Sequence, residues 1–174
     1  CDLARAGEVL ARLRPEVVIN TTAYHRVDEI EGNAELAFRV NAVAVEGLAR
    51  WCAAHDATLV HFSTDYVFRG DQPRPRRETD LAEPISVYGA SKLAGEHLAR
   101  LAAPRHFVVR TCGLYGRRGN PAAGMGGSSF VELMLRLARE GRSMRVVSDQ
   151  VMTPTSTADL AAAVSALIRT ERYG

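Results

Sequence analysis

The sequence predicts an α/β fold built on a parallel sheet. Short apolar runs that suit buried strands alternate almost strictly with longer segments of helical periodicity. Three of these runs end in polar residues, as do strands that lead into a ligand site. The chain of 174 residues, 47% of them hydrophobic and 24% charged, has the size and composition of one globular domain or of a piece of a larger one.

Net charge and cysteine content argue against several classes of function. The formal net charge of +2 is too small to indicate a nucleic-acid or membrane partner, and no apolar run approaches the roughly 20 residues that span a bilayer. The cysteines are odd in number, far apart and without metal-ligand spacing: Cys1, Cys52 and Cys112. They fit a reducing compartment, so we expect a cytoplasmic protein with no metal site.

Each predicted helix follows from apolar residues at helical spacing. The first spans 4–13 and is stopped by Pro15. The last opens at Ser156, with Asp159 three residues on, which is the spacing of a capping box. The helices between them are expected at 33–54, from about Tyr88 onward, and at 129–140.

Each predicted strand is a short run of β-branched or aromatic residues. The runs lie at 17–19, 58–62, 106–110 and 144–147. The first, Val17-Val18-Ile19, is apolar throughout, so we expect both of its faces to be covered. The polar ends of the first three strands should lie side by side along one edge of the sheet, where α/β proteins bind ligands: residues 20–23, 63–65 and 110–111.

Tyr88 and Lys92 stand four residues apart near the start of a predicted helix, after Ser86 as a plausible N-cap. Residues at this spacing share a helix face, and a cation beside a phenol lowers its pKa from about 10. Such a phenol can give a proton to a carbonyl that is being reduced. The spacing is common by chance, so a surface tyrosine beside a solvated lysine is the alternative. An apolar stripe follows along the helix: Leu93, Ala94, Leu98 and Leu101.

Longer strings resemble a known family. Ser-Thr-Asp-Tyr-Val-Phe at 63–68 and Tyr-Gly-x-Ser-Lys-Leu-Ala-Gly-Glu at 88–96 are specific and correctly spaced, and the matches run in order from about Val17 to Asp159. The chain resembles the extended short-chain dehydrogenase/reductases, and among them the dTDP-4-dehydrorhamnose reductase family. The resemblance implies a Rossmann-like, doubly wound parallel sheet. Further matching segments are Val27-Asp28, Glu31, 37–41, 109–111 and 146–150.

The resemblance also implies roles for individual residues. Tyr88 would be the proton donor, Lys92 would hold the nicotinamide ribose and lower the Tyr88 pKa, and Thr64 would hydrogen-bond the substrate oxygen. The cofactor pocket would be formed by Tyr88 and Lys92 together with Asp2, Leu3, Thr22, Ala23, Arg110 and Thr111. The sugar would lie against Asp65, Tyr66 and Gln150.

Purely structural roles are the alternative for several of these residues. Asp65 could cap the loop after its strand, and Gln150 could be a turn residue. Glu96, four residues after Lys92, could form an ordinary helical ion pair with it.

The implied activity is reduction of the 4-keto group of a dTDP-4-keto-6-deoxysugar by NADPH or NADH, which converts dTDP-4-dehydrorhamnose to dTDP-rhamnose. One alternative is a non-catalytic regulatory or binding protein on the same scaffold, since the regulatory subunit of methionine adenosyltransferase also resembles this family. Another is an inactive gene fragment. The intact Tyr88, Lys92 and Thr64 argue against lost catalysis.

The chain departs from the family pattern in ways that bear on ligand binding. The glycine-rich turn that cradles the cofactor pyrophosphate is absent, and the glycine-rich tract at 113–127 comes too late to replace it. Cys112-Gly113 follows Arg110-Thr111 where the family usually has Ser-Trp, and Met152 replaces a usual glycine.

The family also continues past residue 174. We therefore expect a sheet truncated at both ends, over a partial NAD(P)-binding domain spanning 1–174. Parts of the substrate-binding region are expected at about 113–130 and 148–156. Alone, this chain should be inactive, bind cofactor poorly, and be marginally stable or associate, with a homodimer as one expected form.

Overall fold

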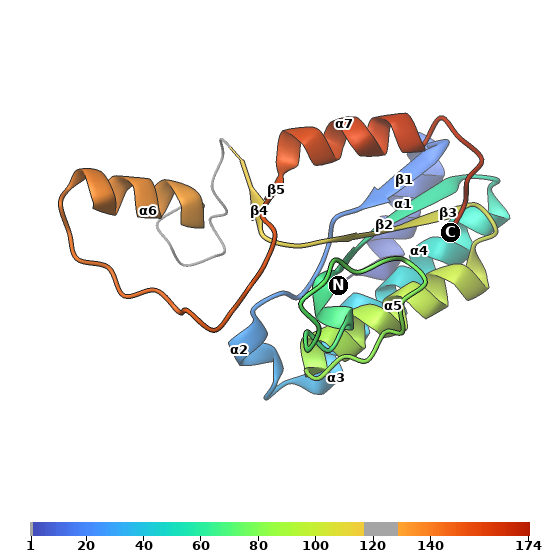
Figure 1. Ribbon diagram of the computed structural model, residues 1–174. Helices are drawn as coiled ribbons and strands as arrows, with labels where there is room; N and C mark the ends of the chain where they lie inside the picture. Colours follow the sequence, from blue (N-terminus) through green and yellow to red (C-terminus); the bar gives the residue numbers. More distant parts are fainter. Residues whose placement is uncertain (1, 117–128) are drawn as a thin grey trace. The chain divides into compact units, whose positions relative to one another are not determined.

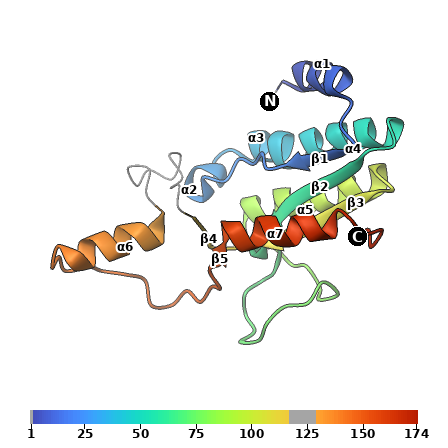
Figure 2. The ribbon, with the colours of Figure 1, turned by 90° about the horizontal axis from the view of Figure 1, so that it is seen from above.

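The computed structural model describes residues 2–116 and 129–174 (Figures 1 and 2). It divides the chain into two compact units. The first comprises Cys1–Arg110 and Ile168–Gly174, and the second comprises Thr111–Leu167. No helix among the described residues is both long enough and apolar enough to cross a membrane.

The first unit is built on a three-stranded sheet in the order β1-β2-β3. β1 and β2 are parallel, with Val17 opposite Thr58. The alternation of strands and helices confirms the predicted α/β class and the first three predicted strands. The elements are α1 (Leu3–Leu13), β1 (Val17–Asn20), α2 (Val27–Ile30), α3 (Ala34–Phe38), α4 (Ala44–Ala54), β2 (Thr58–Thr64), α5 (Val87–Ala102) and β3 (His106–Thr111), whose last residue opens the second unit.

The helix predicted at 33–54 is one continuous helical segment with a change of winding in the middle. α3 leads into a π-helical turn, η1 (Arg39–Val43), which leads into α4. Asn41, in this turn, is fully buried and holds backbone groups of another segment. π-helical turns inside α-helices are frequent at functional sites.

The core of the first unit lies where α4 and α5 pack against β2 (Figures 1 and 2). Leu59 of β2 meets Val45 and Ala49 of α4 and Ala99 of α5 there, and all four side chains are fully buried. The expectation that both faces of β1 are covered is wrong. Val18 packs against this core, but successive side chains point to opposite faces of a strand, and Ile19 is 48% exposed.

The face that α5 buries is not its apolar stripe. Leu101 of that stripe is 83% exposed. The buried face is made of small and charged residues, namely Gly89, Ser91, Lys92, Gly95, Glu96 and Ala99. α5 lies so close to η1 that a Cβ at Gly95 would stand 2.2 Å from the Asn41 carbonyl oxygen, and glycine is therefore required.

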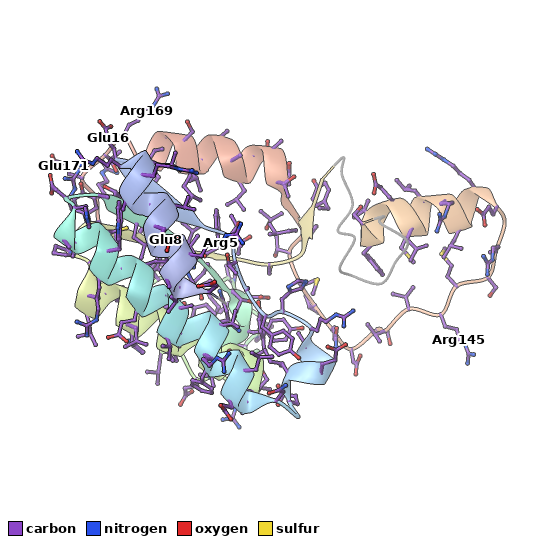
Figure 3. All side chains as sticks on the ribbon, turned by 180° about the vertical axis from the view of Figure 1, so that it is seen from behind. Arg5, Glu8, Glu16, Arg145, Arg169 and Glu171 are labelled. Carbon is purple, nitrogen blue, oxygen red and sulfur yellow. The ribbon has the colours of Figure 1, made fainter. Side chains whose placement is uncertain are left out.

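Charged side chains of both signs project from the surface of the first unit (Figure 3). Arg5 and Glu8 extend from α1. Glu16, Arg169 and Glu171 belong to the same unit.

The second unit contains a two-stranded parallel sheet of β4 (Leu114–Tyr115) and β5 (Thr155–Ser156). Its helices are α6 (Phe130–Arg139) and α7 (Thr157–Leu167). Both were predicted, and α6 starts with a complete capping box between Ser129 and Glu132.

The strand predicted at 144–147 is wrong. These residues have no regular structure, and Val146 and Val147 are 55% and 64% exposed. A strand needs a hydrogen-bonded neighbour, and among the described residues neither sheet includes this segment. Most of the glycine-rich tract at 113–127 lies outside the described residues.

Candidate active site

The three predicted catalytic residues come together where β2 ends and α5 begins. Thr64 is the last residue of β2, and Tyr88 and Lys92 lie on the first two turns of α5. The Tyr88 side chain lies near enough to Thr64 for Thr64 to influence its pKa, and the Lys92 Nζ donates to the Phe62 carbonyl oxygen at 2.7 Å. Thr64 and Lys92 are buried, with 5% and 2% of their surface exposed. The Tyr88 and Lys92 side chains therefore both reach the end of the same strand.

Local sequence explains why Tyr88 stands there. Ser86 caps the helix, as predicted, and its Oγ accepts from the Gly89 amide at 3.1 Å. A Cβ at Gly89 would lie 2.2 Å from the Tyr66 carbonyl oxygen, so only glycine lets the helix approach the turn that follows β2. That turn is a short 3₁₀ helix, η2 (Asp65–Val67), and the Tyr66 ring meets the Tyr88 ring edge-on at 5.5 Å between centroids.

The electrostatics of the pair differ from the prediction. Burial raises the pKa of Tyr88, the Thr64 hydrogen bond opposes that rise, and Asp65 and Tyr66 add to it. The expected lowering of the Tyr88 pKa by Lys92 is therefore wrong, because the Lys92 ammonium is held at the Phe62 carbonyl and is itself desolvated. Burial lowers the pKa of Lys92 to about 8, against the attraction of Glu96.

Glu96 pairs with Arg110 of β3. The Arg110 Nε and Nη2 donate to the two Glu96 carboxylate oxygens at 2.9 and 2.7 Å, and Glu96 is fully buried. In place of the expected helical ion pair with Lys92, Glu96 forms a bidentate pair that joins α5 to β3, and a longer helical contact of 3.8 Å with Arg100. The Arg110 guanidinium also lies 5.0 Å from the centre of the Phe68 ring. Its third nitrogen, Nη1, is buried without a hydrogen-bond partner among the described residues, and the place of Arg110 in the cofactor pocket stays a prediction.

Asn41 connects the loop after β1 to α5, and sequence reasoning gave it no role. Its Oδ1 accepts from the Tyr24 amide at 2.8 Å, and its Nδ2 donates to the Tyr24 carbonyl and to Ser91 Oγ at 2.9 and 3.0 Å. The loop that carries Thr22 and Ala23 is thereby fastened to the helix that carries Tyr88. The sequence signal for Asn41 was a polar amide side chain among the apolar positions of the helix predicted at 33–54.

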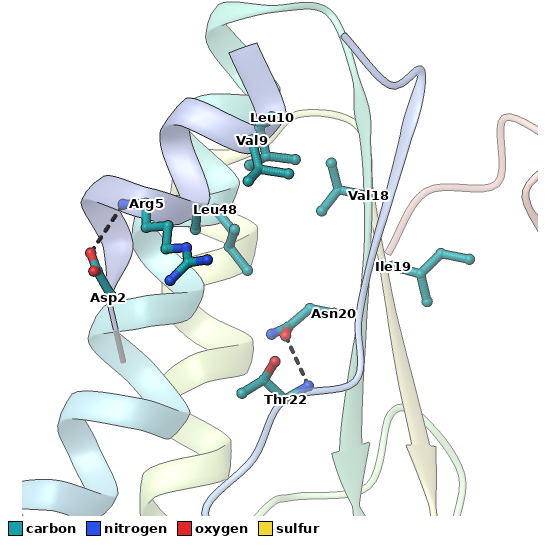
Figure 4. A pocket seen from close by; sticks show the side chains of 10 residues that line it. Asp2, Arg5, Val9, Leu10, Val18, Ile19, Asn20, Thr22 and Leu48 are labelled. Carbon is teal, nitrogen blue, oxygen red and sulfur yellow. Dashed lines mark hydrogen bonds between the residues drawn. The ribbon is translucent and has the colours of Figure 1, made fainter. Parts of the chain in front are cut away.

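An open pocket of about 410 Å³ lies between α1, β1 and α4 (Figure 4). Two predicted cofactor residues, Asp2 and Thr22, line it together with Asn20 and Arg5. Thr64, Tyr88 and Lys92 are not among its lining residues.

Asp2 and Leu3, which were predicted to bind the cofactor, lie at the start of α1. Asp2 is the N-cap of α1, accepting from the Arg5 amide at 3.0 Å, and Leu3 is the first helical residue. The Leu3 side chain lies against Gly47 of α4. Leu3 and Ala23 do not line the pocket described above.

The predicted substrate residues are divided between the units. Asp65 and Tyr66 lie on η2, where Thr64 Oγ1 donates to Asp65 at 3.1 Å and accepts from the Tyr66 amide at 3.2 Å. Thr64, and not Asp65, is therefore the cap of this turn. Gln150 belongs to the second unit and is exposed in the irregular segment before β5. Thr111, a predicted cofactor residue, is the last residue of β3. The described residues contain no group of His, Cys, Asp and Glu suited to a metal ion.

Several known proteins with similar sequences are named dTDP-4-dehydrorhamnose reductase. The chain is 40% identical over 163 residues to dTDP-4-dehydrorhamnose reductase of Salmonella typhimurium, covering 94% of this chain and 52% of that protein. It is 46% identical over 156 residues to the enzyme of the same name from Mycobacterium tuberculosis, covering 87% and 49%. The chain thus spans about half the length of these curated relatives.

A solved structure supports the same relationship. The dTDP-4-dehydrorhamnose reductase from Bacillus anthracis in complex with NADP superposes with a TM-score of 0.90 and 38% identity, covering 99% of this chain and 59% of that one. The predicted Rossmann-like α/β fold is thereby confirmed. The sequence also matches the family described as RmlD substrate binding domain over residues 1–173. This chain therefore belongs to the RmlD substrate-binding domain family.

Proposed function

We propose that this chain carries the proton-donating centre of an NAD(P)H-dependent reductase that converts dTDP-4-dehydrorhamnose to dTDP-rhamnose. The observation that carries the proposal is the convergence of Thr64, Tyr88 and Lys92 at the carboxyl end of β2. Ligands of open α/β sheets bind at such strand ends. The relatives named dTDP-4-dehydrorhamnose reductase support the choice of substrate.

Tyr88 is the acid in this proposal. Its pKa is raised by burial, so the phenol is protonated at neutral pH and has a proton to give. The ketone oxygen becomes strongly basic as it is reduced, and the proton is transferred as that charge develops. The Thr64 hydroxyl, which donates to Asp65 in this structure, would contact the same oxygen. Asp65 and Tyr66 would border the sugar beside it, and Gln150 remains a further proposed sugar contact.

Lys92 suits the ribose of a nicotinamide cofactor. An ammonium group has three donors, and one of them is used on the Phe62 carbonyl oxygen, which leaves two for vicinal hydroxyls. With a pKa of about 8 the group remains largely cationic at neutral pH. When bound, the reduced nicotinamide supplies the hydride.

The other end of the cofactor would be bound away from this lysine. Asp2 and Leu3 would meet the adenine, Thr22 and Ala23 would line the nicotinamide side, and the pocket lined by Asp2 and Thr22 offers carboxylate, amide and hydroxyl groups. Arg110 and Thr111 would border the nicotinamide side. We place the reaction in the cytoplasm, because Cys52 is buried and unpaired, as in reducing compartments.

The test is turnover by the full-length gene product that carries these residues. Loss of NADPH or NADH absorbance on addition of dTDP-4-dehydrorhamnose, with dTDP-rhamnose as product, is the expected result. The UDP-linked 4-keto sugar serves as the nucleotide control and should react more slowly. Absence of turnover with both cofactors would contradict the proposal. Recovery of one stoichiometric enzyme partner from the same inactive preparation would favour the regulatory alternative.

A further inference from the structure

Glu31 reaches the N-terminus of α5 from a distant part of the chain. It follows α2, 56 residues before the start of α5 in the sequence. Its carboxylate accepts from the Val87 amide through both oxygens, at 2.9 and 3.2 Å, and from the Tyr88 amide at 3.4 Å. The backbone of the predicted proton donor is therefore in direct contact with a carboxylate.

The start of α5 has a complete set of hydrogen-bond partners because of this contact. The first N–H groups of a helix lack acceptors within the helix. Ser86 Oγ serves the third helical residue, Gly89, and the Ser86 carbonyl serves Ala90. Glu31 serves the first two, Val87 and Tyr88, which Ser86 does not reach. A negative charge at this end also interacts favourably with the helix dipole.

The carbonyl of Tyr88 is held as well. Ser91 Oγ donates to it at 2.8 Å and itself accepts from Asn41 Nδ2 at 3.0 Å. Tyr88 is thus restrained on its N–H by Glu31 and on its C=O by Ser91. Of the two, only the Glu31 contact comes from the exposed surface, since Ser91 and Asn41 are fully buried.

We propose that Glu31 is a positioning residue for Tyr88. It fixes the first turn of α5, and with it the phenol that stands beside Thr64, without touching substrate or cofactor. The inference rests on the proposed function, because it assigns Tyr88 the acid role. Misplacement of a catalytic group by about 1 Å can cost about a hundredfold in rate, and a contact on its own backbone is a direct means of preventing that.

The test compares Glu31→Ala and Glu31→Gln with the matched control Glu35→Ala. Glu35 lies in the first turn of α3 and has no side-chain hydrogen bond or ion pair among the residues described here. Amide hydrogen exchange of Val87 and Tyr88 measures whether the two amides are hydrogen-bonded, and this measurement does not depend on activity. The effect of the contact on the reaction is measured by turnover of the full-length protein, its KM for NADPH and its solvent isotope effect.

In Glu31→Ala we expect the two amides to lose protection, and kcat to fall about tenfold with little change in the KM for NADPH. The solvent isotope effect should rise, because proton transfer becomes slower relative to other steps. Glu31→Gln keeps an acceptor oxygen and should recover most of the rate, and Glu35→Ala should match the wild type.

If Val87 and Tyr88 keep their protection from hydrogen exchange in Glu31→Ala, Glu31 does not hold these two amides, and the proposal is contradicted. Lost protection with an unchanged kcat and isotope effect would overturn the positioning role. If the wild-type protein shows no turnover, the proposed function fails and the positioning role with it. The exchange data would still decide whether Glu31 holds the start of α5.

Discussion

α1 and α5 both begin with residues predicted to bind the cofactor, yet they are held in different ways. Each has a side-chain N-cap, Asp2 in α1 and Ser86 in α5. α1 has no buried residue, whereas α5 buries six, including Lys92 and Glu96. A cap therefore decides where a helix starts, and the neighbours it packs against decide how firmly it is held. The proposed catalytic residues Tyr88 and Lys92 lie on the buried helix, where Glu96 is paired and glycines let other backbone segments approach closely.

The largest difference between the helices is expected from their glutamates. Glu96→Ala would leave the Arg110 guanidinium beside Phe68 without its carboxylate, and breaking a buried ion pair typically costs about 3–5 kcal/mol. Glu8→Ala on α1 should change the free energy of unfolding by less than about 0.5 kcal/mol, since Glu8 is exposed (Figure 3). Urea unfolding measures both, and similar losses in the two variants would remove the contrast.

Glycine-to-alanine changes should have opposite signs in the two helices. A Cβ at Gly95 would stand 2.2 Å from the Asn41 carbonyl oxygen and 3.3 Å from His61 Nε2, so Gly95→Ala should destabilise by about 3 kcal/mol. A Cβ at Gly7 would meet nothing within 4 Å, so Gly7→Ala should stabilise by about 0.5–1 kcal/mol. Thermal unfolding of the two variants checks the signs, and stabilisation by Gly95→Ala would show that α5 is not packed as described.

His61, which faces α5, should make stability depend on acid. Its pKa is lowered from 6.5 to about 3 by burial and by the charge of Lys92. Between these values the unfolded chain binds a proton that the folded chain does not, so stability is full above about pH 6.5 and falls as the pH drops toward 3. The loss should reach about 2 kcal/mol at pH 5. His61→Gln should flatten the urea-unfolding profile over this range, and an unaltered slope would contradict the assignment.

The smallest difference between the two helices should come from their caps. Asp2→Ala removes the acceptor for the Arg5 amide, and Ser86→Ala removes the acceptor for the Gly89 amide. Each should cost about 1 kcal/mol, because the lost interaction is of the same kind in both helices. Circular dichroism during thermal unfolding gives both values. A loss several times larger at Ser86 than at Asp2 would mean that the caps, too, depend on packing.

Sequence predicted the features that depend on neighbours in the chain. The N-cap Ser86, the strand predicted at 58–62, which in the structure runs on to Thr64, and the helix capped by Ser129 all follow from short-range patterns. The Met144–Val147 run has the composition of a strand, but among the described residues it has no strand partner. Composition alone could not show that.

The features that sequence missed depend on distant partners. Glu96 was weighed against Lys92, four residues away, but its partner is Arg110 on the next strand. The contact of Glu31 with the start of α5 joins residues 56 positions apart. The direction of the Tyr88 pKa shift also depends on burial, which no spacing of Tyr88 and Lys92 reveals. The resemblance predicted which residues are catalytic, and the structure shows which contacts hold those side chains.

The central claim is that Tyr88 donates the proton in a reductase reaction, and turnover by Tyr88→Phe tests it most directly. The control is Tyr173→Phe, which removes a hydroxyl that accepts from Arg105 and has no part in the proposed site. In the full-length protein, Tyr88→Phe should lower kcat by about 10²–10⁴-fold, with an unchanged melting temperature, while Tyr173→Phe keeps wild-type turnover. Turnover of dTDP-4-dehydrorhamnose by Tyr88→Phe at the wild-type rate would contradict the account.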